Sequence, residues 1–327
     1  MKKQSQAYIL RQGESLITHL AAGQVVKTLA DEAATAGGFG ALVMDATIDP
    51  QPIPLHYHEK EHDTWVCTRG RLKVWCEDQC RILTSGDFAY VKPGDVHAYQ
   101  SVAPRTQFFG LVAPGGWEAF FEAAGERWDE PGLPAINHPF DFSRMGPAMA
   151  KYDVHPVQGA TYADVSNGDE SDRELPDASS SYFLQEGYGP RVRTYGHLCT
   201  TLLSRDVSQS SLEMRIVEGP KGARMPTVIH DQTHIFLYML EGEIAFTLGE
   251  EKTVLHAGDS ANIPANTAYT TMVTSGQARW CLGAAHANGL DVWDRLGKPT
   301  QYFTPAAASE DDSIDKVTLE GVDARVL

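Results

Sequence analysis

The sequence contains one pattern twice, 172 positions apart. Residues of the same type stand at corresponding positions in the two copies. The matching pairs are His58 and His230, His62 and His234, Gly70 and Gly242, Gly86 and Gly258, and Asp87 and Asp259. Upstream, AYILRQGES near Ala7 parallels SYFLQEGYG near Ser181. A constant offset over this many positions indicates a duplicated domain.

Each copy consists of short segments in which apolar and polar residues alternate. Gly, Pro and Asp separate these segments about every ten residues, which is typical of antiparallel strands. In the first copy Asp63, Trp65 and Cys67 share one face of a strand, and Gly70 closes a hairpin. Many short strands favour a double-sheet jelly roll or barrel. We therefore expect an all-β protein of two tandem jelly-roll β-barrel domains, with helical periodicity best developed at 116–125.

Changes in amino-acid composition along the chain suggest four regions. We expect an N-terminal domain with the functional site at 1–145 and a C-terminal domain without a complete site at 181–305. The polar, Pro- and Asp-rich stretch 146–180 is expected to be a linker, and 306–327 a C-terminal tail.

Charge and cysteine content narrow the classes of partner. A formal charge of −16 and a pI near 5.1 argue against nucleic acid or an anionic membrane as partner. No apolar run approaches the roughly 20 residues of a membrane span, and the N-terminus has no secretory h-region. Five cysteines without CxxC spacing are expected to be reduced. We expect a cytoplasmic protein, with the choice between monomer and homodimer open.

A cluster of histidines distinguishes the first copy. His56 and His58 stand two positions apart on an extended segment and therefore point to one face. His97 returns on a later strand. Neutral imidazole binds several first-row metals, and three imidazoles leave room for substrate or oxygen. We predict that His56, His58 and His97 bind a metal, with Asp63 as fourth ligand, proton acceptor or partner of an imidazole.

The second copy lacks this set of ligands. Val228, Ile235 and Tyr269 stand where the first copy has His56, Asp63 and His97. We therefore expect one divalent transition metal ion per chain. His62 is expected to be structural because both copies keep it. Glu59 and Glu61 are expected to be solvated loop carboxylates, although Glu61 could turn inward.

The spacing His56-x-His58-x4-Asp63-x6-Gly70, followed by Gly86-Asp87 and His97, resembles the two conserved cupin motifs. More closely, the chain resembles the fungal quercetin 2,3-dioxygenase group of bicupins. The segments that carry the resemblance are HYHEKEHDTWVCTRGRLKVW, RILTSGDFAYVKPGDVHAYQ, FFGLVAPGGWEAFF and YFLQEGYGPRV. The likeness covers both domains in order and is strongest over 54–125.

The resemblance implies a mononuclear site that opens the heterocycle of a flavonol with O2 and releases carbon monoxide. Copper is the implied metal, with iron, manganese, nickel, cobalt or zinc as alternatives. His56, His58 and His97 match the family's three His ligands, and Asp63 matches its glutamate, which ligates the metal and takes the flavonol proton. The matching substrate-pocket positions are Met44, Trp65, Tyr99, Phe108, Val112 and Trp117.

Asp63 is one methylene shorter than the family's glutamate. The loss of about 1.5 Å of reach is large against a metal–oxygen bond of about 2.0–2.2 Å. Either its strand lies closer to the metal, or Asp63 acts without ligating it. The leading hypothesis is a flavonol-cleaving dioxygenase with a small aromatic substrate and O2. The alternatives are a cupin enzyme that oxidises, isomerises or decarboxylates another phenolic or polyketide intermediate, and a non-catalytic bicupin that binds a small molecule.

Overall fold

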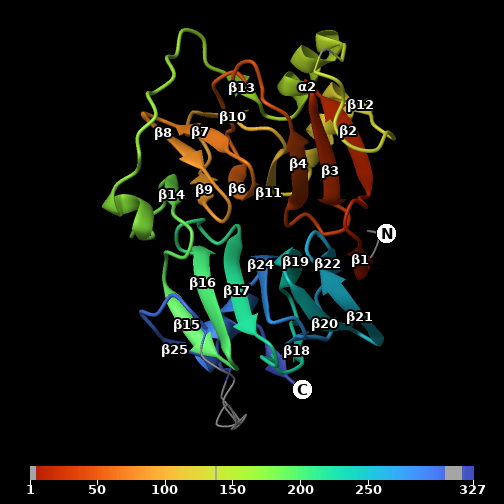
Figure 1. Ribbon diagram of the computed structural model, residues 1–327, viewed down its shortest axis with the longest axis vertical. Helices are drawn as coiled ribbons and strands as arrows, with labels where there is room; N and C mark the ends of the chain where they lie inside the picture. Colours follow the sequence, from red (N-terminus) through yellow and green to blue (C-terminus); the bar gives the residue numbers. More distant parts are fainter. Residues whose placement is uncertain (1–4, 137, 306–318) are drawn as a thin grey trace. The chain divides into compact units, whose positions relative to one another are not determined.

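The computed structural model describes residues 5–136, 138–305 and 319–327 (Figure 1). It divides into two compact units. The N-terminal unit comprises Ser15–Ala33 and Phe39–Glu186. The C-terminal unit comprises Ala34–Gly38 and the described parts of Met1–Glu14 and Gly187–Leu327. Each unit consists mainly of two antiparallel sheets, as the alternating sequence predicted.

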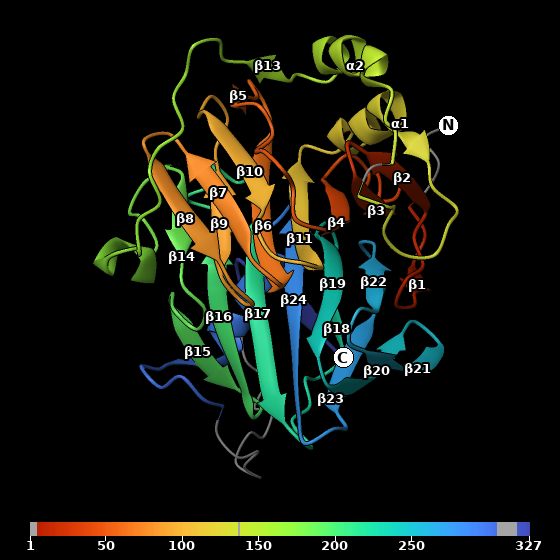
Figure 2. The same cartoon turned by 45° about the horizontal axis from the view of Figure 1, so that its top comes forward.

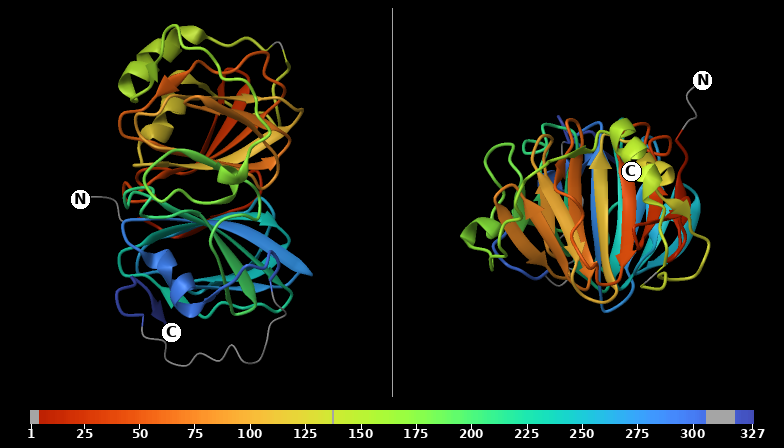
Figure 3. Two further views of the ribbon diagram at one scale, coloured as in Figure 1. Left: turned by 90° about the vertical axis from the view of Figure 1, so that its left-hand side faces the viewer. Right: turned by 90° about the horizontal axis from the view of Figure 1, so that it is seen from above.

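The N-terminal unit has an eight-stranded sheet, in the order β12-β2-β3-β4-β11-β6-β9-β14, and a five-stranded sheet, in the order β13-β5-β10-β7-β8. The strands are β2 (Ile17–Ala21), β3 (Gln24–Ala30), β4 (Gly40–Ala46), β5 (His56–Tyr57), β6 (His62–Arg69), β7 (Leu72–Cys76), β8 (Gln79–Leu83), β9 (Phe88–Val91), β10 (His97–Ser101), β11 (Thr106–Ala113), β12 (Glu126–Arg127), β13 (His155–Pro156) and β14 (Tyr182–Leu184). Figure 3 shows the sheets from two further directions.

Short helices follow β11. They are η1 (Trp117–Ala119), α1 (Phe120–Ala124), η2 (Phe142–Arg144), α2 (Met145–Lys151) and η3 (Glu170–Arg173). The first two confirm the helical periodicity of 116–125. Figure 2 shows α1 and α2 side by side near β2. In the described parts of the chain, no helix is long and apolar enough to cross a membrane.

The C-terminal unit repeats this topology. Its sheets have the orders β1-β22-β19-β24-β17-β16-β15-β25 and β21-β20-β23-β18-β26. The strands are β1 (Tyr8–Leu10), β15 (Arg191–Thr194), β16 (His197–Leu203), β17 (Glu213–Pro220), β18 (Val228–Ile229), β19 (His234–Glu241), β20 (Glu243–Leu248), β21 (Glu251–His256), β22 (Ser260–Ile263), β23 (Tyr269–Val273), β24 (Gln277–Ala285), β25 (Lys298–Pro299) and β26 (Arg325–Val326). Its helices are η4 (Gly289–Asp291) and α3 (Val292–Leu296). The same strand order in both units confirms the duplication.

The compact units differ from the regions expected from the sequence. The N-terminal strand β1 pairs with β22 and so completes the large sheet of the C-terminal unit. Within the stretch expected to be a linker, β13 pairs with β5 of the N-terminal unit. Of the expected tail, residues 306–318 lie outside the described residues, and β26 pairs with β18. These pairings use backbone groups, so the side-chain pattern gives little sign of them.

Both units have apolar interiors. In the C-terminal unit, large buried side chains such as Phe246, Trp280 and Trp293 belong to one core cluster. All five cysteines are buried, and none is joined to another in a disulfide.

Candidate metal centre

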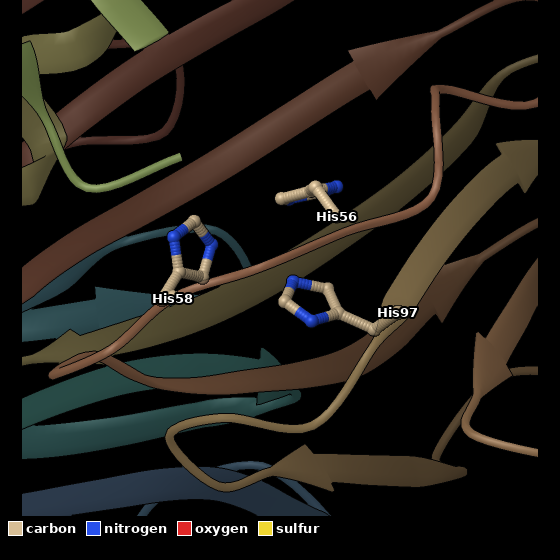
Figure 4. A group of neighbouring side chains, drawn as sticks. All are labelled: His56, His58 and His97. Carbon is tan, nitrogen blue, oxygen red and sulfur yellow. The ribbon is translucent and has the colours of Figure 1, made fainter. Parts of the chain in front are cut away.

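The three predicted histidines converge at one end of the N-terminal barrel. His56 begins β5, His58 follows it, and His97 begins β10 directly opposite His56 in the antiparallel pair. Their ligand nitrogens all lie within 4.8 Å of one another, and all three residues are buried. Figure 4 shows the three rings close together. Backbone pairing between β5 and β10 therefore brings distant parts of the sequence into one cluster of potential ligands.

Each of the three rings is held through its Nδ1 by a backbone carbonyl. The acceptors are the oxygens of Pro54 for His56 (2.8 Å), Asp153 for His58 (2.7 Å) and Asp95 for His97 (3.1 Å). A carbonyl oxygen can only accept, so each Nδ1 carries a proton, and in the neutral form of each ring Nε2 is the atom that keeps its lone pair. The Nε2 atoms of His58 and His97 are buried without a hydrogen-bond partner. Outer hydrogen bonds of this kind orient metal-binding imidazoles, so the three side chains fit a metal ion.

Asp63, the second residue of β6, points at the same cluster. Its Oδ2 lies 3.3 Å from His58 Nε2 and 3.2 Å from His97 Nε2. Metal–ligand bonds of about 2.0–2.2 Å place neighbouring donor atoms roughly 3 Å apart, so the shorter side chain does reach the site. The tight group of ligand atoms nevertheless contains the three histidines and not Asp63. The carboxylate therefore approaches the cluster from the side of His58 and His97.

Burial and neighbouring charges set the protonation states of the cluster. Burial alone would raise the pKa of Asp63, but the imidazoles of His58 and His97 hold it well below its usual value. Burial lowers the pKa of His56 far below its usual value, and the other two imidazoles add to this effect. At neutral pH the site thus combines an ionised carboxylate with a neutral His56 imidazole, the form that binds metals.

Asp153 is a supporting residue that the sequence reasoning missed. Besides its backbone contact to His58, its carboxylate Oδ2 accepts hydrogen bonds from the backbone nitrogens of Glu59 (2.9 Å) and Lys60 (3.0 Å). Its φ of 54° lies in the left-handed region, which Asp tolerates better than most residues. The signal that could have revealed it is the repeat, because Asp323 stands 170 positions later, two positions short of the offset of 172 that the other pairs share.

Of the two orientations that the sequence left open for Glu61, the structure has the inward one. Its Oε2 is buried without a hydrogen-bond partner. Burial, followed by the hydrogen bond to the Asp153 carboxyl, raises the pKa of Glu61 to about 8. Glu59 is exposed, as expected.

His56 and His97 open onto a cavity of about 340 Å³. His56, Asp63 and His97 form part of its wall, while most of the lining is apolar. All six pocket positions implied by the family resemblance line this cavity: Met44, Trp65, Tyr99, Phe108, Val112 and Trp117. Side chains from α1 and α2, including Phe120 and Met149, close another part of the wall. The cavity has the size and apolar character of a small-molecule site.

His62 faces away from the cluster. Its Nδ1 lies 2.7 Å from the hydroxyl of Tyr90 on β9. In the C-terminal unit, His234 Nε2 makes the equivalent contact to Asn262 Oδ1 at 2.8 Å. Tyr90 and Asn262 are themselves 172 positions apart. The repeated pair ties two neighbouring strands together in both units, which is a structural role.

In the C-terminal unit, side chains that do not match the ligand set occupy the corresponding site. Val228, Ile235 and Tyr269 occupy the ligand positions and are buried in its core. The remaining His230 uses Nδ1 toward the Asp323 carbonyl and Nε2 toward the Tyr269 hydroxyl, at 3.2 Å. Within the described part of this unit, no group of three potential ligands comes together.

Comparisons with known proteins agree with the fold. The cupin domain model matches residues 45–106 and 215–283, once in each unit. The quercetin 2,3-dioxygenase of Bacillus subtilis (strain 168) is 25% identical over 282 residues, which cover 84% of this chain and 81% of that protein. The quercetin 2,3-dioxygenase of Aspergillus japonicus is 24% identical over 267 residues, covering 72% and 76%.

Among solved structures, the Ylba protein of E. coli matches with a TM-score of 0.55 at 10% identity, over 87% of this chain and 92% of that one. At this identity the match shows the fold alone. The bacterial and fungal dioxygenases are almost equally similar, so the comparison does not single out the fungal group. The chain is therefore a bicupin with distant similarity to bacterial and fungal quercetin 2,3-dioxygenases.

Proposed function

We propose that this protein is a metal-dependent dioxygenase that cleaves a ring of a flavonol or a related hydroxylated aromatic compound with O2. One observation carries the proposal. His56 and His97 line a mostly apolar cavity, and with the adjacent His58 they form a buried group of three imidazoles whose Nδ1 atoms are all held by backbone carbonyls. The distant similarity to quercetin 2,3-dioxygenases supports the substrate class.

In this proposal His56, His58 and His97 hold one divalent first-row ion. Copper, iron, manganese, nickel, cobalt and zinc all suit three imidazoles and a carboxylate. When bound, the ion would act as a Lewis acid toward a phenolic oxygen of the substrate and would promote the reaction of the substrate with O2. The carbonyls of Pro54, Asp153 and Asp95 keep the three rings in the orientation that this requires.

Asp63 would act as the proton acceptor for the substrate's hydroxyl. Its carboxylate lines the cavity and is ionised, because the two adjacent imidazoles hold its pKa far below neutrality. A general base needs to lie within about 2.6–3.2 Å of the proton that it takes, or one water away. Since Asp63 approaches two of the three histidines but lies outside their tight group, we assign it proton transfer first and ligation second.

The apolar wall would bind the flat rings and exclude water from the reacting centre. Trp65 lies next to His97, with ring centroids 5.7 Å apart, and Trp117 lies 5.2 Å from His58. Both indoles line the cavity beside the histidines. Aromatic side chains recognise polycyclic phenols by offset stacking and edge contacts.

Oxygen uptake and loss of quercetin absorbance, measured with metal-loaded protein, test the proposal. The wild-type protein should consume O2 only when the flavonol is present. Asp63→Asn should retain metal but lose most activity, whereas His97→Ala should lose metal as well. Metal-loaded wild-type protein that leaves the quercetin spectrum unchanged would exclude a flavonol substrate.

A second candidate is a cupin enzyme that oxidises, isomerises or decarboxylates another phenolic or polyketide compound. The position of Asp63 supports this second candidate, because a carboxylate that lies beside only two of the three histidines also suits proton transfer without O2. Oxygen consumption across a panel of phenols separates oxidative from non-oxidative chemistry. A non-catalytic binding role would instead be indicated by protein that takes up no metal.

A further inference from the structure

The cavity contains a second group of polar side chains, which we call the distal polar cluster: Gln24 on β3, Asp49 after β4, and Tyr99 on β10. The Tyr99 hydroxyl donates to Gln24 Oε1 at 2.8 Å. Gln24 Nε2 in turn donates to Asp49 Oδ2 at 3.2 Å. All three residues line the cavity, and Gln24 and Tyr99 are more than nine-tenths buried.

This cluster lies along β10 from the metal centre. His97 begins the strand, Tyr99 follows on the same face, and Asp49 is bound to Ser101 at the strand's other end, where Ser101 N donates to Asp49 Oδ2 at 2.8 Å. Four residues of extended strand span about 13 Å. The Trp65 ring lies near both His97 and Tyr99, 5.7 Å from the His97 ring and 6.5 Å from the Tyr99 ring. A ligand needs more than one aromatic ring to reach both.

The distal polar cluster retains capacity for further hydrogen bonds. Both hydrogen bonds to the Asp49 carboxylate from Gln24 and Ser101 end on Oδ2, which leaves Oδ1 as an acceptor. Gln24 Nε2 has a second N–H, and Tyr99 keeps acceptor lone pairs after donating its proton. Burial raises the pKa of Asp49, against the effect of its hydrogen bonds to Ser101 and Gln24. A carboxylate in a mostly apolar cavity is stabilised by any additional donor.

We propose that the distal polar cluster binds a second hydroxyl group of the aromatic substrate, which donates to Asp49 and accepts from Gln24. This inference rests on the proposed function and narrows it to compounds with a hydroxyl on a ring remote from the metal-binding one. Tyr99 holds the Gln24 side chain in place through its hydrogen bond. Gln24 and Asp49 then contact the hydroxyl group and determine the specificity for it. A site built to bind a hydroxyl rejects the analogue that lacks it, because its own polar groups then stay unpaired.

Equilibrium binding of two flavonols tests the inference. 3-Hydroxyflavone lacks the remote hydroxyl, and its 4′,5,7-trihydroxy derivative kaempferol has it. Binding to the metal-loaded protein is measured without O2, from quenching of tryptophan fluorescence, since Trp65 and Trp117 line the cavity. The wild-type protein should bind kaempferol roughly 10- to 100-fold more tightly than 3-hydroxyflavone.

In Asp49→Asn and Gln24→Met this preference should fall to less than about 5-fold, because kaempferol loses a hydrogen-bond partner, and Gln24→Met should bind 3-hydroxyflavone at least as tightly as the wild type. Asp45→Asn is the matched control, because Asp45 lies on neighbouring β4 and binds Lys27 (3.2 Å) outside the cavity. It should keep the wild-type preference. Tyr99→Phe provides a third variant if either of the others fails to fold.

The outcomes separate this inference from the proposed function. Equal affinity of the wild-type protein for the two flavonols, or an undiminished preference in Asp49→Asn and Gln24→Met, would overturn the role of the distal polar cluster. A preference that these variants abolish, together with no O2 uptake by the wild type, would support the cluster while rejecting the dioxygenase reaction. Binding of neither compound would overturn both.

Discussion

His58 and Asp153, 95 residues apart, are joined by a hydrogen bond from the imidazole Nδ1 to the backbone carbonyl, at 2.7 Å. The C-terminal unit repeats this contact between His230 and Asp323, at 2.6 Å. In each unit the aspartate carboxylate caps the loop after the histidine, and the chain then continues into β13 or β26. The contact is thus a property of the duplicated fold, and among the described residues only the N-terminal unit combines it with a group of three potential metal ligands.

Asp153→Ala should weaken metal binding about 10- to 100-fold, because the loop that carries His58 loses two hydrogen bonds to its backbone. Asp323→Ala is the matched control. It removes the same kind of cap from Asp231–Thr233 and should cost about 1–2 kcal/mol of stability without changing metal affinity. Chelator competition and thermal unfolding measure the two effects. Equal metal affinities in the two variants would show that the loop does not support His58.

Gly110→Ala should destabilise the N-terminal unit by about 1–3 kcal/mol. Gly110 lies on β11 at the cavity wall, where an added Cβ would lie 2.2 Å from the backbone oxygen of Thr64 on β6. The sheet would have to shift because a backbone atom cannot rotate away. Gly146→Ala in α2 meets open space and should be neutral or slightly stabilising. Urea unfolding of both variants provides the comparison, and equal midpoints would contradict it.

Acid should destabilise the C-terminal unit through His197. This residue is fully buried between Trp280 and Trp293, and burial lowers its pKa to about 4. The unfolded chain binds the proton near pH 6.5 and the folded chain only near pH 4, so this contribution is complete above 6.5 and falls as pH decreases toward 4. The full shift corresponds to about 3 kcal/mol.

The measurement is unfolding free energy against pH in wild type and His197→Gln. The variant should lose less stability than the wild type between pH 7 and pH 4.5, whatever its stability at pH 7. Parallel curves for wild type and His197→Gln would show that His197 does not titrate in this way.

The sequence predicted the fold well because the signals involved are side-chain patterns. Strand alternation around Trp65 and the fixed spacing of the repeat each report which face of a strand is buried. The sequence also predicted the histidine cluster. His56 and His58 stand two positions apart on an extended segment, and a later strand returns with His97, which pairs with His56. These features depend on residue type, so one sequence displays them.

The features that the sequence did not predict depend on backbone groups or on residues that are distant in the sequence. Asp153 orients His58 through a carbonyl that every residue has, and it lies in a polar stretch without apolar periodicity. The edge strands β1 and β14 have three residues each, too few for a pattern. The raised pKa of Glu61 arises from the burial and the Asp153 carboxyl that only the folded chain provides.

Metal content per chain, measured by elemental analysis after metal-replete purification, tests the three-histidine site most directly. Wild-type protein should contain one ion per chain, His97→Ala should lose most of it, and His234→Ala, which changes a buried histidine of the C-terminal unit, should retain it. A wild-type protein without metal, or a His97→Ala variant that binds one ion as tightly as the wild type, would contradict the site.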